Sequence, residues 1–230
     1  MTKLSILMSA YNSELYIEQS IESILSQTFI DFEFLIIDDG SNDNTYKICE
    51  NFKKLDPRII LFRNKNNIGL TKSLNKLLDV SSYDLIARQD ADDKSYNSRL
   101  HKQLAYLDKK NLDFVFSKSL YKKENRVIPR FSNNIPNSIV IKFKNPFIHG
   151  TLLGKKNIIF KLGKYNEDFY YAQDYKLVND IIKSGYKVKI INEVLYESNF
   201  ENNISTIKKD QQSYYADCVR KNIKPNPKFI

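Results

Sequence analysis

The 230-residue sequence contains only two cysteines and no long apolar run. Cys49 and Cys218 lie far apart, so they indicate neither a disulfide framework nor a zinc site, and a reducing cytoplasm is the expected compartment. A helix that spans a bilayer needs roughly 20 consecutive apolar residues, and no run approaches that length. The apolar stretch at residues 4–8 is short and polar residues follow it at once, which is not typical of a signal peptide. These absences predict a cytoplasmic globular protein.

Glycine-rich phosphate loops are also missing. No predicted strand is followed by a dinucleotide-binding fingerprint or a Walker-type loop, and Asn67-Ile68-Gly69 is too short a match for either. A nucleotide bound by this chain would therefore need another device to hold its diphosphate, and a metal ion is the expected one.

Positive charge is in excess, with 36 Lys and Arg against 27 Asp and Glu and a net charge of +9. Such an excess attracts nucleic acid, an anionic membrane or phosphorylated substrates, but no nucleic-acid-binding module is recognisable. The C-terminal stretch concentrates cations, namely Lys208, Lys209, Arg220, Lys221, Lys224 and Lys228. This stretch is compatible with contact to anionic lipid, and equally with a solvated helix face and a frayed tail.

The first half of the chain alternates between strand and helix patterns. Strands are expected at Leu4–Met8, Phe32–Ile37, Ile59–Phe62 and Asp84–Ala87, with helices at about 17–25, 44–55, 68–78 and 100–107. Ser13 and Ser41 are candidate N-caps for the first two helices. This order predicts an α/β fold with a mostly parallel sheet and helices on both faces.

The pattern is looser in the second half. Short strands are expected at Phe114–Ser117, Ile139–Phe143, Phe147–Leu153, Val188–Ile191 and Val194–Tyr196. A helix is expected from Asp174 to Lys183, before Gly185, and another at about 204–221. Because there is no internal repeat and no long linker, one compact domain is predicted.

An acidic tetrad, Asp90-Ala91-Asp92-Asp93, follows the fourth predicted strand. Neighbouring carboxylates repel each other unless a cation lies between them. Oxygen ligands suit Mg²⁺ or Mn²⁺, and such ions are commonly shared with substrate phosphates. The tetrad therefore indicates a metal–diphosphate site, and the alternative is a solvated acidic turn in which Asp93 caps the next helix.

A second polar cluster is expected at the same edge of the sheet, because ligands of parallel sheets bind beyond the carboxyl ends of the strands. Asp38 and Asp39 end the second predicted strand, and either carboxylate is suited to accept hydrogen bonds from a base or a ribose. Tyr11 follows the first strand and offers a ring for stacking on a base. The alternative is an ordinary capped turn beside an exposed tyrosine.

The second half offers two further candidates. Asp174 is either a helix N-cap or a general base that faces the crevice. His149 is suited to bind metal or phosphate, although a lone histidine is more often a structural hydrogen-bond donor. His101 lies between cationic residues of a predicted helix and is expected at the surface.

The motifs together match a known family. They are SILMSAYN at 5–12, SILSQTF at 23–29, FEFLIIDDGS at 32–41, NIGL at 67–70 and ARQDADD at 87–93. In their order and spacing the chain resembles the family 2 glycosyltransferases of GT-A fold, inverting enzymes that transfer sugars from nucleotide donors. The resemblance covers nearly the whole chain and is strongest over residues 5–107.

The resemblance implies roles for matching residues. Ser9 and Tyr11 would flank the base, and Asp39 would hydrogen-bond it, usually a uracil. Asp92 would be the direct ligand of Mn²⁺ or Mg²⁺, with Asp90 near the ribose or the metal. Asp174 matches the catalytic base.

His149 and Gln173 match positions on the acceptor side. Gln173 stands where relatives have an acid, so the electrostatic help of that neighbour is missing. Ser9 stands where many relatives have proline, which alters local stiffness. The motif Ser41-Asn42-Asp43 varies the common Ser-Thr-Asp, and the chain is too short for the acceptor-binding additions of larger relatives.

The resemblance implies a GT-A domain over residues 1–203, with a nucleotide-binding half at 1–110 and an acceptor-binding half at 111–203, followed by a basic helix and tail at 204–230. The predicted function is metal-dependent, inverting transfer from a nucleotide-sugar, preferably a UDP-sugar, in capsule or lipopolysaccharide assembly. The acceptor is expected to be a glycan or a lipid-linked glycan at the cytoplasmic face of the inner membrane. The alternatives are a sugar nucleotidyltransferase, which normally carries an N-terminal glycine-rich loop that this chain lacks, and an inactive glycan-binding homologue.

Overall fold

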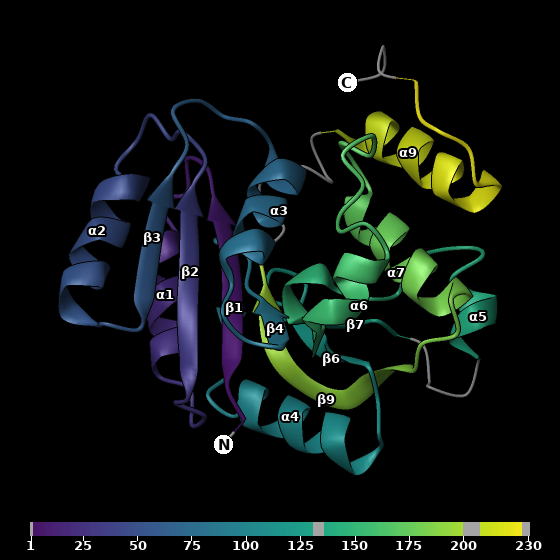
Figure 1. Cartoon of the computed structure of the whole chain (residues 1–230), viewed down its shortest axis with the longest axis horizontal. Coiled ribbons are helices and arrows are strands. Elements are labelled where there is room, and N and C mark those ends of the chain that lie inside the picture. Colours follow the sequence, from purple (N-terminus) through teal and green to yellow (C-terminus); the bar gives the residue numbers. More distant parts are fainter. Residues whose placement is uncertain (1, 131–135, 200–207, 227–230) are drawn as a thin grey trace.

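One curled sheet runs through the molecule (Figure 1). The computed structural model describes residues 2–130, 136–199 and 208–226. Its strands are β1 (Leu4–Ala10), β2 (Phe32–Asp38), β3 (Ile59–Arg63), β4 (Leu85–Arg88), β5 (Lys94–Ser95), β6 (Phe114–Tyr121), β7 (Arg126–Ile128), β8 (Leu153–Lys155) and β9 (Val188–Ser198). They are ordered β3-β2-β1-β4-β8-β6-β9-β5, with β7 paired to β6.

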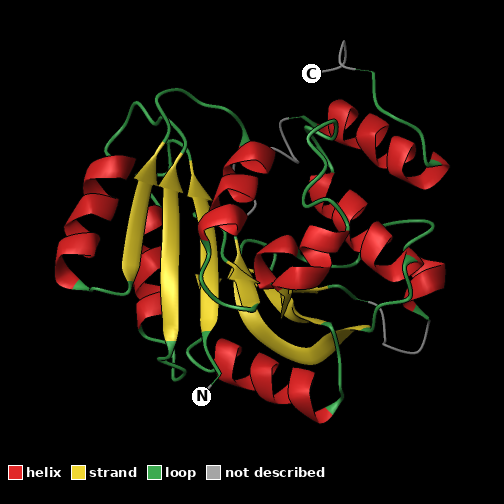
Figure 2. Cartoon of the chain, viewed as in Figure 1, coloured by secondary structure: helices red, strands yellow, loops and turns green. Residues whose placement is uncertain are grey.

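Helices cover both faces of this sheet (Figure 2). They are α1 (Ile17–Leu25), α2 (Thr45–Leu55), α3 (Leu70–Val80), α4 (Arg99–Lys109), α5 (Asn137–Val140), α6 (Lys156–Lys161), α7 (Gln173–Lys183) and α9 (Lys209–Lys221), with a 3₁₀ turn at His149–Thr151. Every helix among the described residues is too short or too polar to cross a lipid bilayer.

The first four strands in the sheet order run parallel. Leu4 of β1 lies opposite Phe32 of β2 and Leu85 of β4, and Asp38 of β2 lies opposite Arg63 of β3. This register brings the carboxyl ends of β1, β2 and β4 to one edge, where ligands of such sheets bind. Beyond β4 the sheet is mixed, because β8 is antiparallel to β4 and β6, whereas β6 and β9 are parallel. The predicted α/β class is confirmed, with the predicted parallel order among β1, β2, β3 and β4 and a mixed sheet beyond them.

The alternation of side chains along the parallel strands explains the two cores. Ile6 of β1 and Ile36 of β2 belong to the cluster beneath α1, α2 and α4. Leu7, which follows Ile6, and Leu35, which precedes Ile36, belong to the cluster beneath α3, α6 and α7. Successive residues of a strand point to opposite faces, so a strand that is apolar throughout needs cover on both sides.

Several predicted elements differ from the structure. The expected strand at Ile139–Phe143 is instead the short helix α5 and the turn that follows it. The helix forms because Pro136 begins a helical turn, in which the Pro136 carbonyl accepts from the amide groups of Ile139 and Val140. The expected strand at Phe147–Leu153 is a loop with the 3₁₀ turn, and only β8 after it is extended. The two last strands are one long strand, β9, whose pairing with β6 is irregular near Ser117 and Lys118.

The two predicted N-caps are also wrong. The side chain of Ser13 donates to the Tyr11 carbonyl, and that of Ser41 accepts from the Asn12 amide, so neither caps a helix. Both serines instead stabilise the loops that follow β1 and β2.

The C-terminal helix is part of the main core. Tyr215, Cys218 and Val219 of α9 are buried in the cluster that also contains Val178 and Ile181 of α7. The helix was expected to begin near residue 204, but α9 begins at Lys209, and residues 200–207 and Lys228 lie outside the described residues. Residues 209–221 are therefore packed as an integral layer and do not form a separate appendage.

Candidate functional site

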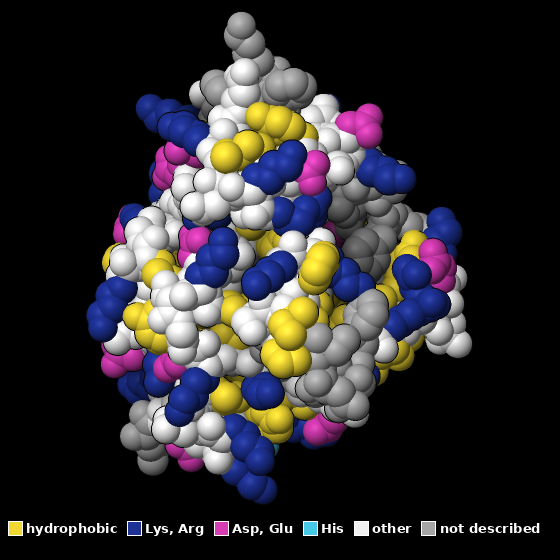
Figure 3. Space-filling view, turned by 90° about the vertical axis from the view of Figure 1, so that its right-hand side faces the viewer, with side chains coloured by type: hydrophobic (Ala, Val, Ile, Leu, Met, Phe, Trp, Pro, Cys, Tyr) yellow, Lys and Arg dark blue, Asp and Glu magenta, His cyan; other side chains and the backbone are white. Residues whose placement is uncertain are grey.

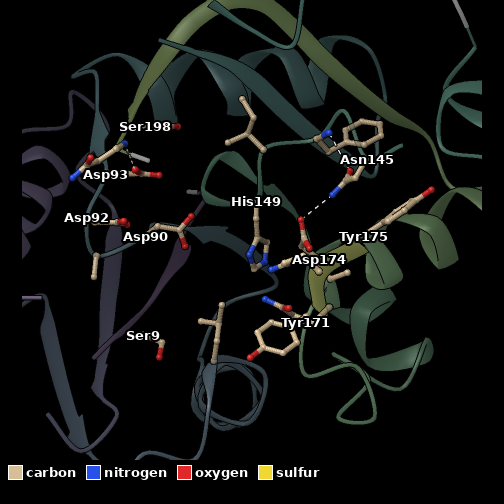
Figure 4. Close-up of a pocket in the computed structure, with 18 of the residues that line it drawn as sticks. Ser9, Asp90, Asp92, Asp93, Asn145, His149, Tyr171, Asp174, Tyr175 and Ser198 are labelled. Atoms are coloured by element: carbon tan, nitrogen blue, oxygen red, sulfur yellow. Dashed lines mark hydrogen bonds between the residues drawn. The ribbon is translucent and has the colours of Figure 1, made fainter. Parts of the chain in front are cut away.

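A cleft of about 1300 Å³ lies at the carboxyl edge of the parallel strands. Its walls come from the loops after β1, β2 and β4, from the segment around the 3₁₀ turn, and from α7 and α9. Most of the residues predicted from the sequence line it, namely Ser9, Tyr11, Asp39, Asp90, Asp92, His149, Gln173 and Asp174. Several of these side chains converge in Figure 4, where His149 lies between Asp90 and Asp174.

Tyr11 forms part of the first wall and is 44% exposed. The loop that carries it is tied to the loop after β2, because the Asn12 amide donates to Ser41 Oγ and the Asn42 amide donates to Asn12 Oδ1. The expectation that Tyr11 lies beside the β2 turn is confirmed. An exposed ring on a braced loop is suited to stack on a flat ligand.

Asp39 organises the loop between β3 and α3. Its Oδ1 accepts from Asn64 Nδ2 at 2.8 Å and from the Ile68 amide at 3.0 Å, and its Oδ2 accepts from the Gly69 amide at 2.9 Å. A carboxylate offers about four acceptor positions, so these three bonds leave one of them for a ligand. Asp39 is therefore both a structural clamp and a candidate contact in the cleft.

Asp38 does not reach the cleft. It is fully buried on β2, and its Oδ2 lies 3.0 Å from Arg63 Nε. Its Oδ1 also accepts from the Ser41 amide. The predicted ligand contact for Asp38 is wrong, because adjacent residues at the end of a strand point to opposite sides and only Asp39 faces the cleft.

Asp90 is held by a buried arginine that the sequence analysis did not single out. Arg88 is fully buried on β4, and its Nη2 donates to Asp90 Oδ1 at 2.5 Å. Its Nη1 donates to the carbonyl oxygens of Leu7 and Gln89. Arg88 therefore fixes the Asp90 carboxylate at the cleft floor and partly compensates its charge.

Gly150 packs tightly against the same carboxylate. A Cβ atom at this position would lie 2.2 Å from the Tyr196 hydroxyl and 2.6 Å from Asp90 Oδ2. Both distances are far shorter than van der Waals contact, so only glycine allows the 3₁₀ turn to approach β4 this closely.

Asp92 lines the cleft and, within the part of the chain that the structure describes, forms no ion pair with a lysine or arginine side chain. Burial and the neighbouring Asp90 carboxylate raise the pKa of Asp92 to about 6. A site in which two carboxylates disfavour each other's charge is a site that a cation would stabilise. The described residues contain no group of three or more His, Cys, Asp or Glu arranged to hold a metal ion, so a bound ion would need ligands from a substrate as well.

Asp93 is neither a solvated turn residue nor a helix cap, so the alternative interpretation of the tetrad is wrong for this residue. It is 8% exposed, it precedes β5, and its Oδ1 accepts from the Asn199 amide at 2.7 Å. The Tyr196 hydroxyl accepts from the Asp90 amide and also hydrogen-bonds Asp93. Burial raises the pKa of Asp93 well above its usual range, and the Asp92 and Asp90 carboxylates add to the increase. Asp93 thus ties the acidic loop to the end of β9.

Asp174 lies in the first turn of α7, on the opposite wall from the acidic tetrad (Figure 4). Its side chain does not cap the helix; its Oδ2 accepts from Asn145 Nδ2 at 2.8 Å. Burial raises the pKa of Asp174, and Asp90 adds to the increase. Ala172, which precedes the helix, has a φ of 54°, a strained conformation for a residue with a side chain that is often found at functional sites.

His149 is held between the two walls. Its Nε2 lies 2.7 Å from the Tyr165 hydroxyl, and burial lowers the pKa of His149 well below its ordinary value. The imidazole is therefore neutral at physiological pH and is a hydrogen-bonding group rather than a cation. Gln173 is 8% exposed and lines the same part of the cleft.

The residues that the sequence analysis missed are the supports of this site: Arg88, Asn145, Gly150, Tyr165 and Tyr196. The only sequence signal for Arg88 was a charged residue at the end of an apolar strand, directly before the tetrad. Asn145, Tyr165 and Tyr196 are distant in sequence from their partners, and no local pattern marks them.

We expect Arg88→Met to lower the free energy of unfolding by about 2–4 kcal/mol, because it removes one partner of a buried ion pair and the donors to the Gln89 and Leu7 carbonyl groups, of which Leu7 keeps the bond from the Gln89 amide. Urea unfolding at pH 7.5 would measure this. Lys102→Met is the control, since Lys102 pairs with Glu193 at the surface and such a pair contributes at most about 1 kcal/mol. Equal stabilities of the two variants would contradict the supporting role of Arg88.

Solved structures share this architecture. S. aureus TarS in complex with UDP-GlcNAc has a TM-score of 0.76 at 20% identity, covering 88% of this chain and 60% of that one. The mannosyltransferase PcManGT from Pyrobaculum calidifontis, in complex with GDP-Man and Mn²⁺, has a TM-score of 0.76 at 16% identity, covering 98% of this chain and 66% of that one. The sheet and its cleft thus define the fold of a GT-A glycosyltransferase.

Sequence relatives identify the family. Residues 5–166 match the model of Glycosyl transferase family 2. An uncharacterised glycosyltransferase of Methanocaldococcus jannaschii is 35% identical over 224 residues, which are 92% of this chain and 77% of the relative. The GalNAc(5)-diNAcBac-PP-undecaprenol β-1,3-glucosyltransferase of Campylobacter jejuni is 30% identical over 178 residues, 74% of this chain and 57% of the relative. The chain belongs to glycosyl transferase family 2, as its motifs predicted.

Two further relatives have names that state the glycan they help to build. They are an O-antigen biosynthesis glycosyltransferase of Escherichia coli and an amylovoran biosynthesis glycosyltransferase of Erwinia amylovora. The chain spans 77% of the length of the M. jannaschii relative and 57% of the length of the C. jejuni relative.

Proposed function

We propose that this chain is an inverting, metal-dependent glycosyltransferase that moves a sugar from a UDP-sugar to a hydroxyl group of a lipid-linked glycan. The observation that carries the proposal is the arrangement of carboxylates on the two walls of one cleft. Asp90 and Asp92 lie on the wall formed by β4, and Asp174 lies on the wall formed by α7. This is the arrangement that a displacement reaction needs, with the leaving diphosphate on one side and the attacking hydroxyl on the other.

The loops after β1 and β2 are the proposed nucleotide site. Tyr11 offers an exposed ring for the base, and Asp39 retains one acceptor position for a base N–H group. Ser9 lines the same wall. The UDP-GlcNAc complex of TarS supports a UDP-sugar for this fold, whereas the GDP-Man complex of PcManGT shows that the base can differ between structures of this kind.

Asp92 is the proposed direct ligand of Mn²⁺ or Mg²⁺, with Asp90 beside it. When bound, the ion would neutralise the charge that develops on the departing diphosphate. The residues fit such an ion because Asp92 is partly buried next to a second carboxylate and its pKa is raised to about 6. Arg88 already holds one oxygen of Asp90, so Asp92 is the less compensated carboxylate of the two.

Asp174 is the proposed general base. Its raised pKa makes it a stronger proton acceptor than an exposed aspartate, and the hydrogen bond from Asn145 fixes the direction of its carboxylate. Asp174 would take the proton of the acceptor hydroxyl as that oxygen attacks the anomeric carbon from the face opposite the diphosphate. One direct displacement of this kind inverts the anomeric configuration. His149, neutral and hydrogen-bonded to Tyr165, would contact the acceptor or the sugar beside this base.

The C. jejuni relative acts on a glycan joined through a diphosphate to undecaprenol, and this supports a lipid-linked acceptor for the present chain. For the present chain we place this acceptor at the cytoplasmic face of the inner membrane, as part of the same proposal.

The test is nucleotide release from a panel of UDP-, GDP- and CDP-sugars with Mn²⁺ or Mg²⁺. We expect UDP to appear from one or a few UDP-sugars in a metal-dependent reaction, and addition of lipid-linked acceptor to increase the rate with formation of an inverted product. Formation of pyrophosphate from UTP and a sugar phosphate would instead identify a sugar nucleotidyltransferase. Stable binding of glycan without release of any nucleotide would identify an inactive homologue.

A further inference from the structure

A long stretch of the second half carries only positive charge. From Asn125 to Asn166 the sequence contains eight cations and no Asp or Glu; the cations are Arg126, Arg130, Lys142, Lys144, Lys155, Lys156, Lys161 and Lys164. Of these, Arg126, Arg130 and Lys144 line the cleft. The cleft is therefore acidic where the donor would bind and bordered by cations in the segment that leads to Asn145.

Large apolar side chains project from the same region. Phe143 is 72% exposed and Ile139 is 48% exposed, and Ile223, beyond the end of α9, is 52% exposed. The Arg220 guanidinium pairs with Asp217, which partly compensates its charge, and donates to the Phe143 carbonyl at 3.4 Å, so it joins the end of α9 to this turn. We call the set Ile139, Lys142, Phe143, Lys144, Arg220, Lys221 and Ile223 the α5–α9 patch.

The α5–α9 patch is not accounted for by packing of the fold. Tyr215 and Val219 on the inner face of α9 are buried, whereas Ile223 beyond its end and Phe143 after α5 stay outside the core. Single exposed apolar residues are ordinary, but an exposed phenylalanine between two lysines is typical of a surface that meets lipid. Figure 3 shows Lys and Arg side chains interspersed with hydrophobic ones over this side of the molecule, with fewer acidic side chains.

We propose that the α5–α9 patch docks on an anionic bilayer, with Phe143 and Ile139 entering the interface and the surrounding cations contacting lipid headgroups. The proposal extends the sequence-based hypothesis of a contact through the C-terminal segment, because α9 is packed in the core and contributes its end to the patch. Lys144 lies in the patch and also lines the cleft, and the next residue, Asn145, holds Asp174. Docking would bring the base side of the cleft to the lipid surface, and the orientation toward a lipid-linked acceptor rests on the proposed function.

The experiment compares two double variants of the full chain. Lys142→Glu/Phe143→Ser changes the patch at residues that do not line the cleft. Lys53→Glu/Leu55→Ser makes the same chemical changes on α2, where Leu55 is 80% exposed and which lies at the far side of the molecule (Figure 1). Flotation is measured with vesicles of phosphatidylglycerol and phosphatidylethanolamine, and with phosphatidylcholine vesicles, at low and high salt.

We expect the wild type and the α2 variant to float with the anionic vesicles only, and less at high salt. The patch variant should bind those vesicles at least about tenfold more weakly. Equal flotation of the two variants, or no flotation of the wild type, would overturn the proposal. It would also be overturned if sedimentation showed a wild-type dimer that the patch variant converts to a monomer, since a second copy would then cover the patch.

Nucleotide release in the absence of lipid separates this inference from the proposed function. We expect all three proteins to release UDP at the same rate in solution. If none releases nucleotide while flotation follows the variants as expected, the enzymatic proposal fails and the docking surface stands. If all release nucleotide and float alike, the enzymatic proposal stands and the docking surface fails.

Discussion

Asp174→Asn is expected to lower kcat for sugar transfer by about 10²–10⁴-fold, the usual contribution of a general base. The substitution keeps the shape of the side chain, and its amide oxygen can still accept from Asn145, so the local structure is preserved. What is lost is the ability to accept the proton of the acceptor hydroxyl. The measurement is the initial rate of product formation with saturating donor, metal and acceptor.

The pH profile distinguishes a base from a structural residue. The pKa of Asp174 is raised above its ordinary value by burial and by Asp90, and only the deprotonated form can act as a base. In the wild type, kcat/KM should therefore fall as the pH is lowered through this raised pKa. With Mn²⁺ kept saturating at each pH, that limb should disappear from the residual activity of Asp174→Asn.

Asp180→Asn is the matched control for this experiment. Asp180 lies further along α7 and forms a partly buried ion pair with Lys176. Its substitution should leave kcat and the pH profile unchanged. Wild-type turnover in Asp174→Asn, or the same loss in both variants, would refute the assigned role of Asp174.

The general plan of the site follows from the sequence because parallel strands share one carboxyl edge. Asp39 and Asp90 are separated by fifty-one residues in the chain (90 − 39) and line one cleft, since each follows a strand of the same parallel set. The position of Asp174 depended on the resemblance to a family, because α7 reaches the cleft through tertiary packing and not through strand order.

The errors also have physical causes. Asp38 and Asp39 are adjacent and chemically identical, so the sequence does not tell them apart. Side chains alternate between the two faces of β2, and the face that packs under α1 and α2 determines that Asp38 turns away from the cleft. The segment around Ile139 is rich in β-branched residues, which favour strands, but such a short apolar run is ambiguous and Pro136 opens a helical turn. Arg88 was overlooked because a buried charge is stable only with partners, and its partners are carbonyl and carboxylate groups that the fold supplies.

Asp92→Ala is expected to abolish metal-dependent turnover, with kcat lower by about 10³-fold or more, since a metal contributes several kcal/mol to stabilising the charge of a leaving group. Binding of Mn²⁺ in the presence of UDP, followed by calorimetry, should be lost to the same degree. Because a metal ligand must be deprotonated, wild-type Mn²⁺ affinity should decrease as the pH falls below about 6, the raised pKa of Asp92.

The stability of this variant separates the loss of a metal ligand from misfolding. The pKa of Asp92 in the folded chain, about 6, is above the ordinary aspartate value of 3.8, so the folded state binds the proton more tightly than the unfolded state. By linkage, protonated Asp92 favours folding, and this contribution is lost as the pH rises through 6. At pH 7.5 the charged carboxylate opposes folding of the metal-free protein, so its removal should leave the Tm unchanged or higher.

Asp84→Ala is the control, because Asp84 is exposed and precedes the opposite end of β4. It should keep Mn²⁺ binding and turnover. A metal-free Asp92→Ala protein with a lowered Tm would make Asp92 a structural residue, and retained Mn²⁺ affinity would move the metal site away from it. We expect Asp92→Ala to be as stable as the wild type, to bind no Mn²⁺ and to release no UDP. That combination of results would identify Asp92 as the residue of the acidic loop that binds the ion.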